Sequence, residues 1–277
     1  MFKRLKTMKD LLWAAGIGLA LLFLLIGLVA ASFTSYHGDR ERPVMNLRTE
    51  KEEPAAGESA APAQLGEGLH ADGTLHPLVE TGDAGEDYLN SLTVLCDSSM
   101  DSLRSAGLCF ASIWSSETGT LAMNDTDNWT IRYPGDGSQI GPASAALIAK
   151  PKILIISVGS DGLSDLSKES FVENYEALIR AIASASPKTT IVCLSPCSVT
   201  AAYAADDGLS KEKAAEINGW IKTVCVDTGA YYADLTEVLC TDGYLRDEYA
   251  DGSGRALNNT GLREVLNFLR DHSTEAQ

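Results

Sequence analysis

"LTVLCDSSMDSL", residues 92–103, is the stretch of sequence that decides the fold. A short apolar run ends at Cys96, and Asp97, Ser98 and Ser99 follow it before an amphipathic stretch resumes. This pattern predicts a buried strand that brings polar side chains to the edge of a sheet. Ser98 is therefore a candidate nucleophile. The same residues are also consistent with a simpler role, in which Asp97, Ser98 or Ser99 caps the helix that follows.

The rest of the chain after residue 87 repeats the alternation of strand and helix. Apolar runs lie at 92–95, 108–113, 153–158, 190–194 and 230–235, and amphipathic stretches at 99–106, 138–149, 170–185, 210–224 and 260–270. Strands that are apolar throughout and alternate with helices are typical of a parallel sheet covered on both faces. We expect residues 87–272 to form a flavodoxin-like three-layer α/β/α sandwich around a five-stranded parallel sheet.

The N-terminal region has the pattern of a membrane anchor. Four cations lie within residues 1–10, and residues 11–33 carry no charge. About 20 apolar residues are enough to cross a bilayer, and the cations place the preceding end in the cytoplasm. We expect a single transmembrane helix over 11–33, with the C-terminal domain outside the cell. A cleaved signal peptide, with Val29-Ala30-Ala31 at its cleavage site, is the alternative.

Residues 34–86 are rich in Glu, Gly, Ala and Pro and show little apolar periodicity. Such a composition buries too little surface to offset the entropy of ordering the chain. We therefore expect a flexible, disordered linker over 34–86 that holds the domain away from the membrane.

Composition argues against several classes of partner and ligand. The net charge is −16 over 277 residues, which disfavours binding to nucleic acid because a phosphate backbone needs a basic face. The six cysteines lie mostly in apolar runs, and we expect buried thiols. Cys193 and Cys197 lack the second close pair and the histidines of a zinc site, so we expect no metal and no cofactor.

Two later segments place polar residues where predicted strands or loops end. They are "GSDG" at 159–162 and "DGSGRALNNTG" at 251–261. Together with the serine at 98, they resemble the blocks of the SGNH, or GDSL-type, hydrolases, of the membrane-anchored sort found in Gram-positive bacteria. The resemblance covers residues 88–272. It is supported by "FVENYEALIRAI", "SPCSV" and "YYADLTEVL", which occur in the family order.

The resemblance implies a role for five positions. Ser98 takes the place of the nucleophile, and Gly159 and Asp161 take the place of the block that binds the oxyanion. Asp251 takes the place of the triad acid. Alignment through the last block puts Ala256 where the family has its catalytic histidine.

The departures from the family pattern predict impaired catalysis. Ala256 is not a base, and an alignment without a gap would put Gly254 there instead. None of the four histidines lies at a predicted strand end, and a serine hydroxyl is a poor nucleophile without an adjacent base. An ionised Asp161 accepts hydrogen bonds but cannot donate one to an oxyanion.

Two functions of different class follow from the sequence. In the first, the domain is an impaired hydrolase that binds a component of the cell envelope, either an acylated glycan or a partner protein. In the second, it is a weak esterase or deacetylase that acts on O-acyl groups of envelope carbohydrate with Ser98 as nucleophile. Arg255 is a candidate for contacting an anionic group. Trp114 and Trp129 are expected in the core, with a sugar-stacking surface as the alternative.

Overall fold

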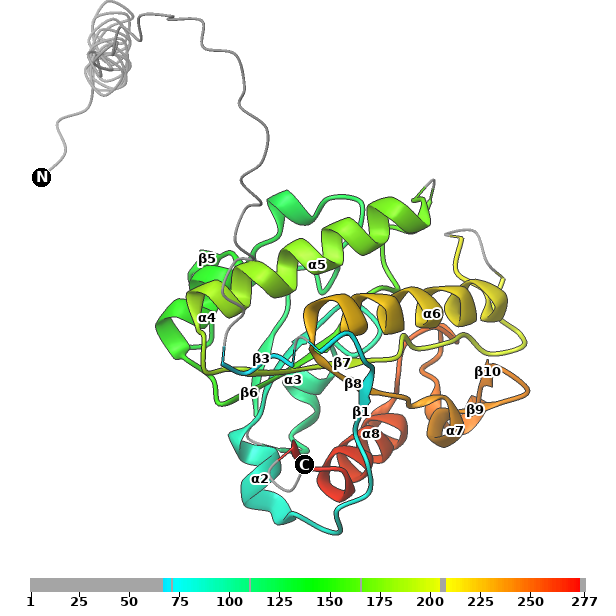
Figure 1. Cartoon of the computed structure of the whole chain (residues 1–277). Coiled ribbons are helices and arrows are strands. Elements are labelled where there is room, and N and C mark those ends of the chain that lie inside the picture. The colour runs from blue at the N-terminus through cyan, green and yellow to red at the C-terminus, as the bar shows by residue number, and fades with distance from the viewer. Residues whose placement is uncertain (1–66, 71, 110, 165, 205–207, 275–277) are drawn as a thin grey trace, which may run out of the picture. The chain divides into compact units, whose positions relative to one another are not determined.

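The computed structural model describes residues 67–70, 72–109, 111–164, 166–204 and 208–274 (Figure 1). The predicted transmembrane helix at 11–33 and the linker up to residue 66 lie outside these ranges. Among the helices that are described, none has the length and apolar character needed to cross a bilayer.

The central sheet is parallel and has six strands in the order β1-β8-β7-β6-β2-β3. The five predicted strands are all present, and they follow the predicted flavodoxin-like order. The prediction of five strands was wrong by one, because the short strand β1 adds to the edge at β8. The strands are β1 (His76–Pro77), β2 (Thr93–Cys96), β3 (Ser112–Trp114), β6 (Ile153–Ser157), β7 (Thr190–Leu194) and β8 (Tyr231–Ala233).

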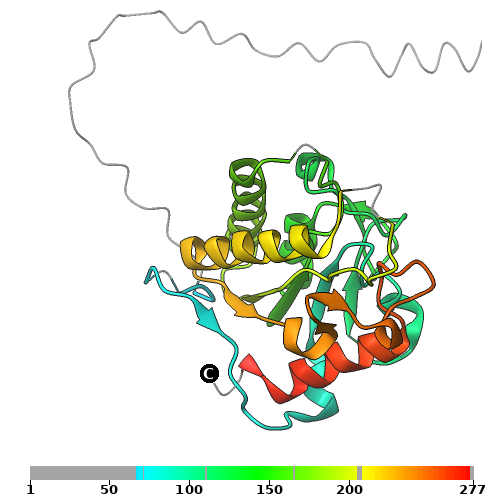
Figure 2. The ribbon, with the colours of Figure 1, turned by 90° about the vertical axis from the view of Figure 1, so that its right-hand side faces the viewer.

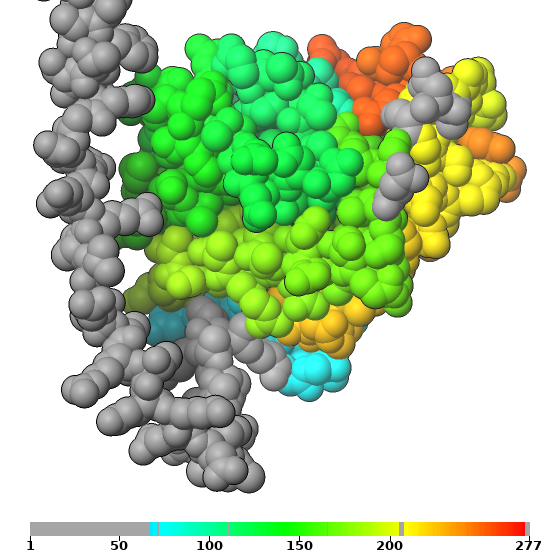
Figure 3. Space-filling model, turned by 90° about the horizontal axis from the view of Figure 1, so that it is seen from above, coloured from blue at the N-terminus to red at the C-terminus, as the bar shows by residue number. Residues whose placement is uncertain are grey.

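Helices cover both faces of the sheet, which gives the predicted three layers (Figures 1 and 2). One face carries α4 (Pro142–Ala149), α5 (Lys168–Ala185) and α6 (Lys211–Thr228). The other face carries α2 (Gly85–Ser91), α3 (Leu103–Ala106), α7 (Thr236–Leu239) and α8 (Asn259–Asp271). In the space-filling view, α5 and α6 lie side by side on the first of these faces (Figure 3).

Two predicted helices are shorter than expected. The stretch 99–106 begins as a turn and becomes α3 only at Leu103, and the stretch 138–149 begins as a strand before α4. The remaining elements are two hairpin-like sheets and two short 3₁₀ helices. These are β4 (Ile131–Arg132) with β5 (Gln139–Ile140), β9 (Cys240–Thr241) with β10 (Tyr244–Leu245), η1 (Thr126–Asn128) and η2 (Asp247–Tyr249).

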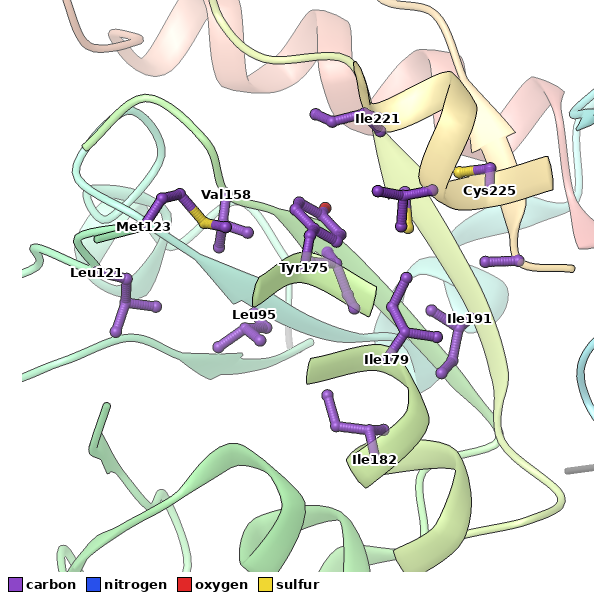
Figure 4. Close-up of a cluster of buried hydrophobic side chains, with 14 of the residues drawn as sticks. Leu95, Leu121, Met123, Val158, Tyr175, Ile179, Ile182, Ile191, Ile221 and Cys225 are labelled. Carbon is purple, nitrogen blue, oxygen red and sulfur yellow. The ribbon is translucent and has the colours of Figure 1, made fainter. Parts of the chain in front are cut away.

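The apolar strands fill two separate cores, one on each face of the sheet. Leu95 and Ile156 point to the core under α5 and α6, whereas Val94 and Ile155 point to the core under α8. All four side chains are at most 1% exposed, as expected when successive side chains of a strand face opposite layers. Figure 4 shows part of the first core. Trp114 and Trp129 belong to this core, as predicted.

The domain begins earlier than the predicted boundary at residue 87. Residues 67–70 and 72–84 lead past the outer side of β8 toward α2, drawn in cyan in Figure 2. Leu69 and Leu78 are buried, and the main chain donates hydrogen bonds from His70 to Gly229 and from Leu78 to Tyr232. We call residues 67–84 the edge strap. Composition did not indicate it, because the strap buries only a few apolar side chains and is held mainly by backbone hydrogen bonds.

The contact between the edge strap and the end of α6 can be tested by substitution of a glycine. Gly229 ends α6 with φ +76°, and a Cβ there would lie 2.2 Å from the carbonyl oxygen of His70. Gly73 has a similar φ of +73°, but a Cβ there would meet nothing within 4 Å. Both alanine variants carry the strain of a positive φ, and only Gly229→Ala also displaces the strap.

We therefore expect Gly229→Ala to lower the free energy of unfolding by about 1–3 kcal/mol more than Gly73→Ala, measured by urea denaturation. Equal effects of the two substitutions would show that the strap is not docked on Gly229.

Candidate active site

Three segments meet where the carboxyl ends of the parallel strands lie side by side. β2 ends at Cys96 and delivers Ser98, β6 ends at Ser157 and delivers Asp161, and the loop before α8 delivers Arg255. Parallel strands collect the residues that follow them at one edge, which explains why positions far apart in sequence come together. Ser98 is half-buried, and its hydroxyl donates to Asp161 Oδ1 at 2.6 Å.

The carboxylate of Asp161 is the hub of this cluster. It is 3% exposed, and Oδ1 accepts from the Ser98 hydroxyl and from Arg255 Nη2 at 2.7 Å. Oδ2 accepts from the backbone N–H of Ser98 at 3.2 Å and from that of Leu121 at 3.0 Å. Converging backbone N–H groups are the usual construction of an oxyanion hole. Here both are engaged by a carboxylate of the chain itself.

Arg255 occupies the position beside the serine where a base would be needed. Its Nη1 donates to Ser98 Oγ, and its Nη2 also donates to the carbonyl oxygen of Ser160 at 2.6 Å. The side chain is 18% exposed. Sequence alignment pointed to Ala256 as the position of the lost histidine, but it is the side chain of Arg255 that reaches Ser98. Arg255, a candidate for contacting an anionic group, forms an ion pair with the Asp161 carboxylate.

The loop that carries Arg255 is held at several points. Gly254 has φ +76°, its carbonyl accepts from the N–H of Thr200 at 2.9 Å, and a Cβ there would lie 2.5 Å from Thr200 Oγ1. The N–H of Leu257 donates to the carbonyl of Ser99 at 2.9 Å. Asn258 donates to the carbonyl of Ala250 at 2.7 Å and caps α8 with its side-chain oxygen. Arg255 is therefore positioned by a fixed loop.

Asp251, the position of the triad acid, is exposed and closes the turn of its own loop. Its Oδ1 accepts from the N–H of Ser253 at 3.0 Å and from that of Ala256 at 3.4 Å. Turn chemistry thus accounts for the hydrogen bonds described for this carboxylate. Asp251 and Ser98 both line an open depression of about 770 Å³, so they share one edge of the sheet as predicted.

The described histidines lie away from Ser98. His70 and His76 pack around Tyr231 at the start of β8, which is the opposite edge of the sheet. His272 is at the end of α8, with Nδ1 2.9 Å from the carbonyl oxygen of Phe268. Among the described residues, His70, His76 and His272 therefore make their contacts away from Ser98.

Asp97 is a second buried carboxylate in the site, and sequence reasoning treated it only as a possible cap. It is fully buried, and it accepts hydrogen bonds from the N–H groups of Ser99, Gly159 and Ser160 and from the Ser99 hydroxyl. Burial and the nearby charge of Asp161 outweigh these donors and raise the pKa of Asp97 to about 6. Gly159 is needed here because its φ is +121° and a Cβ would press on Phe171 at 3.3 Å.

The depression beside Ser98 is lined mainly by hydroxyl, amide and carboxylate groups. Its lining residues are Ser98, Asp101, Ser102, Ser105, Asp251, Ala256, Leu257, Asn258, Asn259 and Thr260. Such a surface can form hydrogen bonds with a polar ligand. Within the described part of the chain, no group of His, Cys, Asp and Glu side chains is arranged to hold a metal ion.

The fold and site define an α/β protein with a serine at the end of its first core strand. Residues 110–267 match the family model described as the GDSL-like Lipase/Acylhydrolase family, and the chain belongs to this family. The matched region contains Asp161, Arg255 and Asp251, and it begins after Ser98. No curated protein matches the chain.

Three solved structures are similar to the chain at low sequence identity. A lipase/acylhydrolase from Enterococcus faecalis is 16% identical with a TM-score of 0.42, covering 65% of this chain and 95% of that one. A GDSL-like lipase from Bacteroides thetaiotaomicron is 11% identical with a TM-score of 0.40, covering 66% and 87%. A carbohydrate esterase family 3 protein from Talaromyces cellulolyticus is 14% identical with a TM-score of 0.40, covering 65% and 93%.

The raised pKa of Asp97 predicts a pH dependence of stability. A carboxyl whose pKa rises from 3.8 in the unfolded chain to about 6 in the folded one binds more protons when folded. Its contribution therefore favours folding at acid pH and is lost as the pH rises from about 4 to above 6. We expect the free energy of unfolding of the wild type, relative to Asp97→Asn, to fall by about 2 kcal/mol between pH 4.5 and 7.5. A difference that is constant with pH would contradict the shift.

The four donors around Asp161 predict that an asparagine is poorly tolerated there. The amide of Asp161→Asn would turn an N–H toward donors and would leave Arg255 without a buried counter-ion. We expect a loss of about 2–4 kcal/mol in the free energy of unfolding, against less than about 1 kcal/mol for the exposed control Asp251→Asn. A neutral effect of Asp161→Asn would show that the carboxylate is not required by its surroundings.

Proposed function

We propose that the protein is a non-hydrolytic member of its family that binds a component of the cell envelope through the depression beside Ser98. The component is an acylated glycan or a partner protein. The proposal includes the predicted anchor at 11–33, which would hold the domain at the outer side of the cell membrane. The observation that carries it is that the Ser98 hydroxyl donates to Asp161 and accepts from Arg255.

This network opposes acyl transfer at each step. The Ser98 hydroxyl receives a hydrogen bond from Arg255, which engages one of its two lone pairs and makes the oxygen a weaker nucleophile. The backbone N–H groups of Ser98 and Leu121 already bind the carboxylate of Asp161, so an incoming carbonyl oxygen finds neither donor open. A hydrolase would need a base and an oxyanion site, and the residues beside Ser98 provide neither in an unoccupied form.

A weak serine esterase is the second candidate, because one carboxylate does reach the serine. Asp161 Oδ1 accepts a hydrogen bond from Ser98 Oγ at an oxygen–oxygen distance of 2.6 Å, which is within the reach that a general base requires. However, a carboxylic acid is a far stronger acid than a serine hydroxyl, so a carboxylate is a weak base toward Ser98. Proton transfer from Ser98 to Asp161 is therefore strongly uphill, and we favour the non-hydrolytic function.

An ester-hydrolysis assay separates the two candidates. We expect the purified protein to hydrolyse p-nitrophenyl acetate at the rate of the buffer, and Ser98→Ala to leave that rate unchanged. The physical reason is the absence of an available base and oxyanion site. Robust hydrolysis that disappears in Ser98→Ala would overturn the non-hydrolytic function and would assign Asp161 as the base.

Binding is tested at the same depression. Ser105 is exposed and lines it, so Ser105→Trp should fill part of the space and weaken binding of an O-acetylated oligosaccharide in a calorimetric titration at least about fivefold. Ala177→Trp, which places an exposed indole on α5, is the matched control and should leave binding unchanged. Equal binding by both variants would exclude the depression as the glycan site.

A further inference from the structure

The second edge of the central sheet, at β3, is open over part of its length. The N–H of Ser112 donates to the carbonyl of Leu92 at 3.0 Å, so Ser112 turns its backbone groups toward β2. In a parallel strand the next residue turns its groups the other way, so the N–H and C=O of Ile113 face outward. Neither outward group is hydrogen-bonded to another described residue.

The hairpin of β4 and β5 covers only the carboxyl end of this edge. The N–H of Arg132 donates to the carbonyl of Ser115 at 2.9 Å, and the pairing stops there. The open part of the edge lies in a groove of about 480 Å³. We call it the β3 groove; it is lined by Arg104, Ala111, Ser112, Ile113, Arg132, Tyr133, Pro134 and Gly137.

The charge of the β3 groove is opposite to that of the chain. The protein carries 38 acidic and 22 basic residues apart from histidine, yet the groove lining contains two arginines and no acid. Arg104 is partly neutralised by Asp101 at 2.7 Å. Arg132 is exposed, and its guanidinium forms no hydrogen bond or ion pair with another described residue.

We propose that the β3 groove binds an extended, acidic peptide segment of a partner protein, which adds to the sheet as a strand beside β3. An added strand supplies both the acceptor for the Ile113 N–H and the donor for its C=O. Its acidic side chains pair with Arg132 and Arg104. A polyanion without N–H groups cannot satisfy the outward carbonyl. A second copy that paired through its own β3 edge would bring its arginines against Arg104 and Arg132.

The peptide site is separate from the depression beside Ser98, since the two share no lining residue. Binding in the β3 groove therefore does not depend on the proposed function, and Ser98→Ala should leave it unchanged. A strand that is added here extends the same sheet whose carboxyl edge carries Ser98. The partner would be held on the flank of the domain, beside the depression at that edge.

The test uses the full chain and a fluorescein-labelled Val-Glu-Val-Glu-Val-Glu peptide, with binding measured by fluorescence anisotropy. Arg132→Glu should weaken binding about tenfold, because it replaces an attraction with a repulsion, and it should fold because Arg132 is exposed. The matched control is Arg263→Glu, the same charge change at an exposed position on α8, which should alter binding less than about twofold.

A second experiment compares two versions of the peptide, each N-methylated at every other residue but in opposite register. Each version keeps its charges and loses the backbone donors on one side. The version methylated on the edge-facing side should bind at least about tenfold more weakly.

Four results would overturn the proposal. Absence of binding by the wild type at millimolar peptide would remove the site. Equal binding by the peptide and both of its N-methylated versions, or equal weakening by Arg132→Glu and Arg263→Glu, would show general electrostatic attraction without strand addition. A dimer of the full chain that forms in sedimentation experiments and blocks the peptide would assign the edge to a second copy.

Discussion

Two neighbouring buried carboxylates, Asp97 and Asp161, set the constraint on which the site depends. A buried charge is stable only when donors and a countercharge surround it. Asp97 accepts hydrogen bonds from backbone N–H groups in the turn after β6. Asp161 accepts them from the backbone N–H groups of Ser98 and Leu121 and from the guanidinium of Arg255. The conformations of three loops are therefore tied to two side chains. The raised pKa of Asp97 shows that this environment remains costly for a second negative charge.

The same constraint explains why an acid and an arginine belong together in this site. An asparagine at 161 would leave Arg255 with a buried charge and a weaker partner, and a neutral residue at 255 would leave two carboxylates without a nearby cation. Neither change is favourable alone. The pair also engages the groups that acyl transfer would use: Asp161 binds the backbone N–H donors of Ser98 and Leu121, and Arg255 donates to the Ser98 hydroxyl. Under the proposed function, the charge balance of the site and the lack of hydrolysis have the same cause.

The sequence predicted the parts of the molecule that depend on local pattern. Buried strands such as 153–157 are apolar on both faces and were recognised for that reason, and the order of polar residues at strand ends placed Ser98 and Asp161 together. The edge strap was missed because two-residue pairing by backbone groups leaves no apolar pattern. The role of Arg255 was predicted only as contact with an anion, since the reach of a long side chain depends on the loop that carries it. Leu121 contributes only its backbone N–H to the site, and no pattern of side chains in the sequence can indicate such a contact.

The two edges of the sheet are closed in different ways, and this difference bears on which partner the domain can accept. At β8 the edge strap pairs with the outer strand and leaves little of it open. At β3 the hairpin pairs only with Ser115, and the remaining edge lies beside Arg132. Charged residues along an open edge are a common protection against pairing between identical chains. In a chain with a net charge of −16, a cation at the edge repels the same cation of a second copy while it attracts an acidic strand. In the proposed strand addition, the cation that disfavours pairing of two β3 edges would therefore also select an acidic partner.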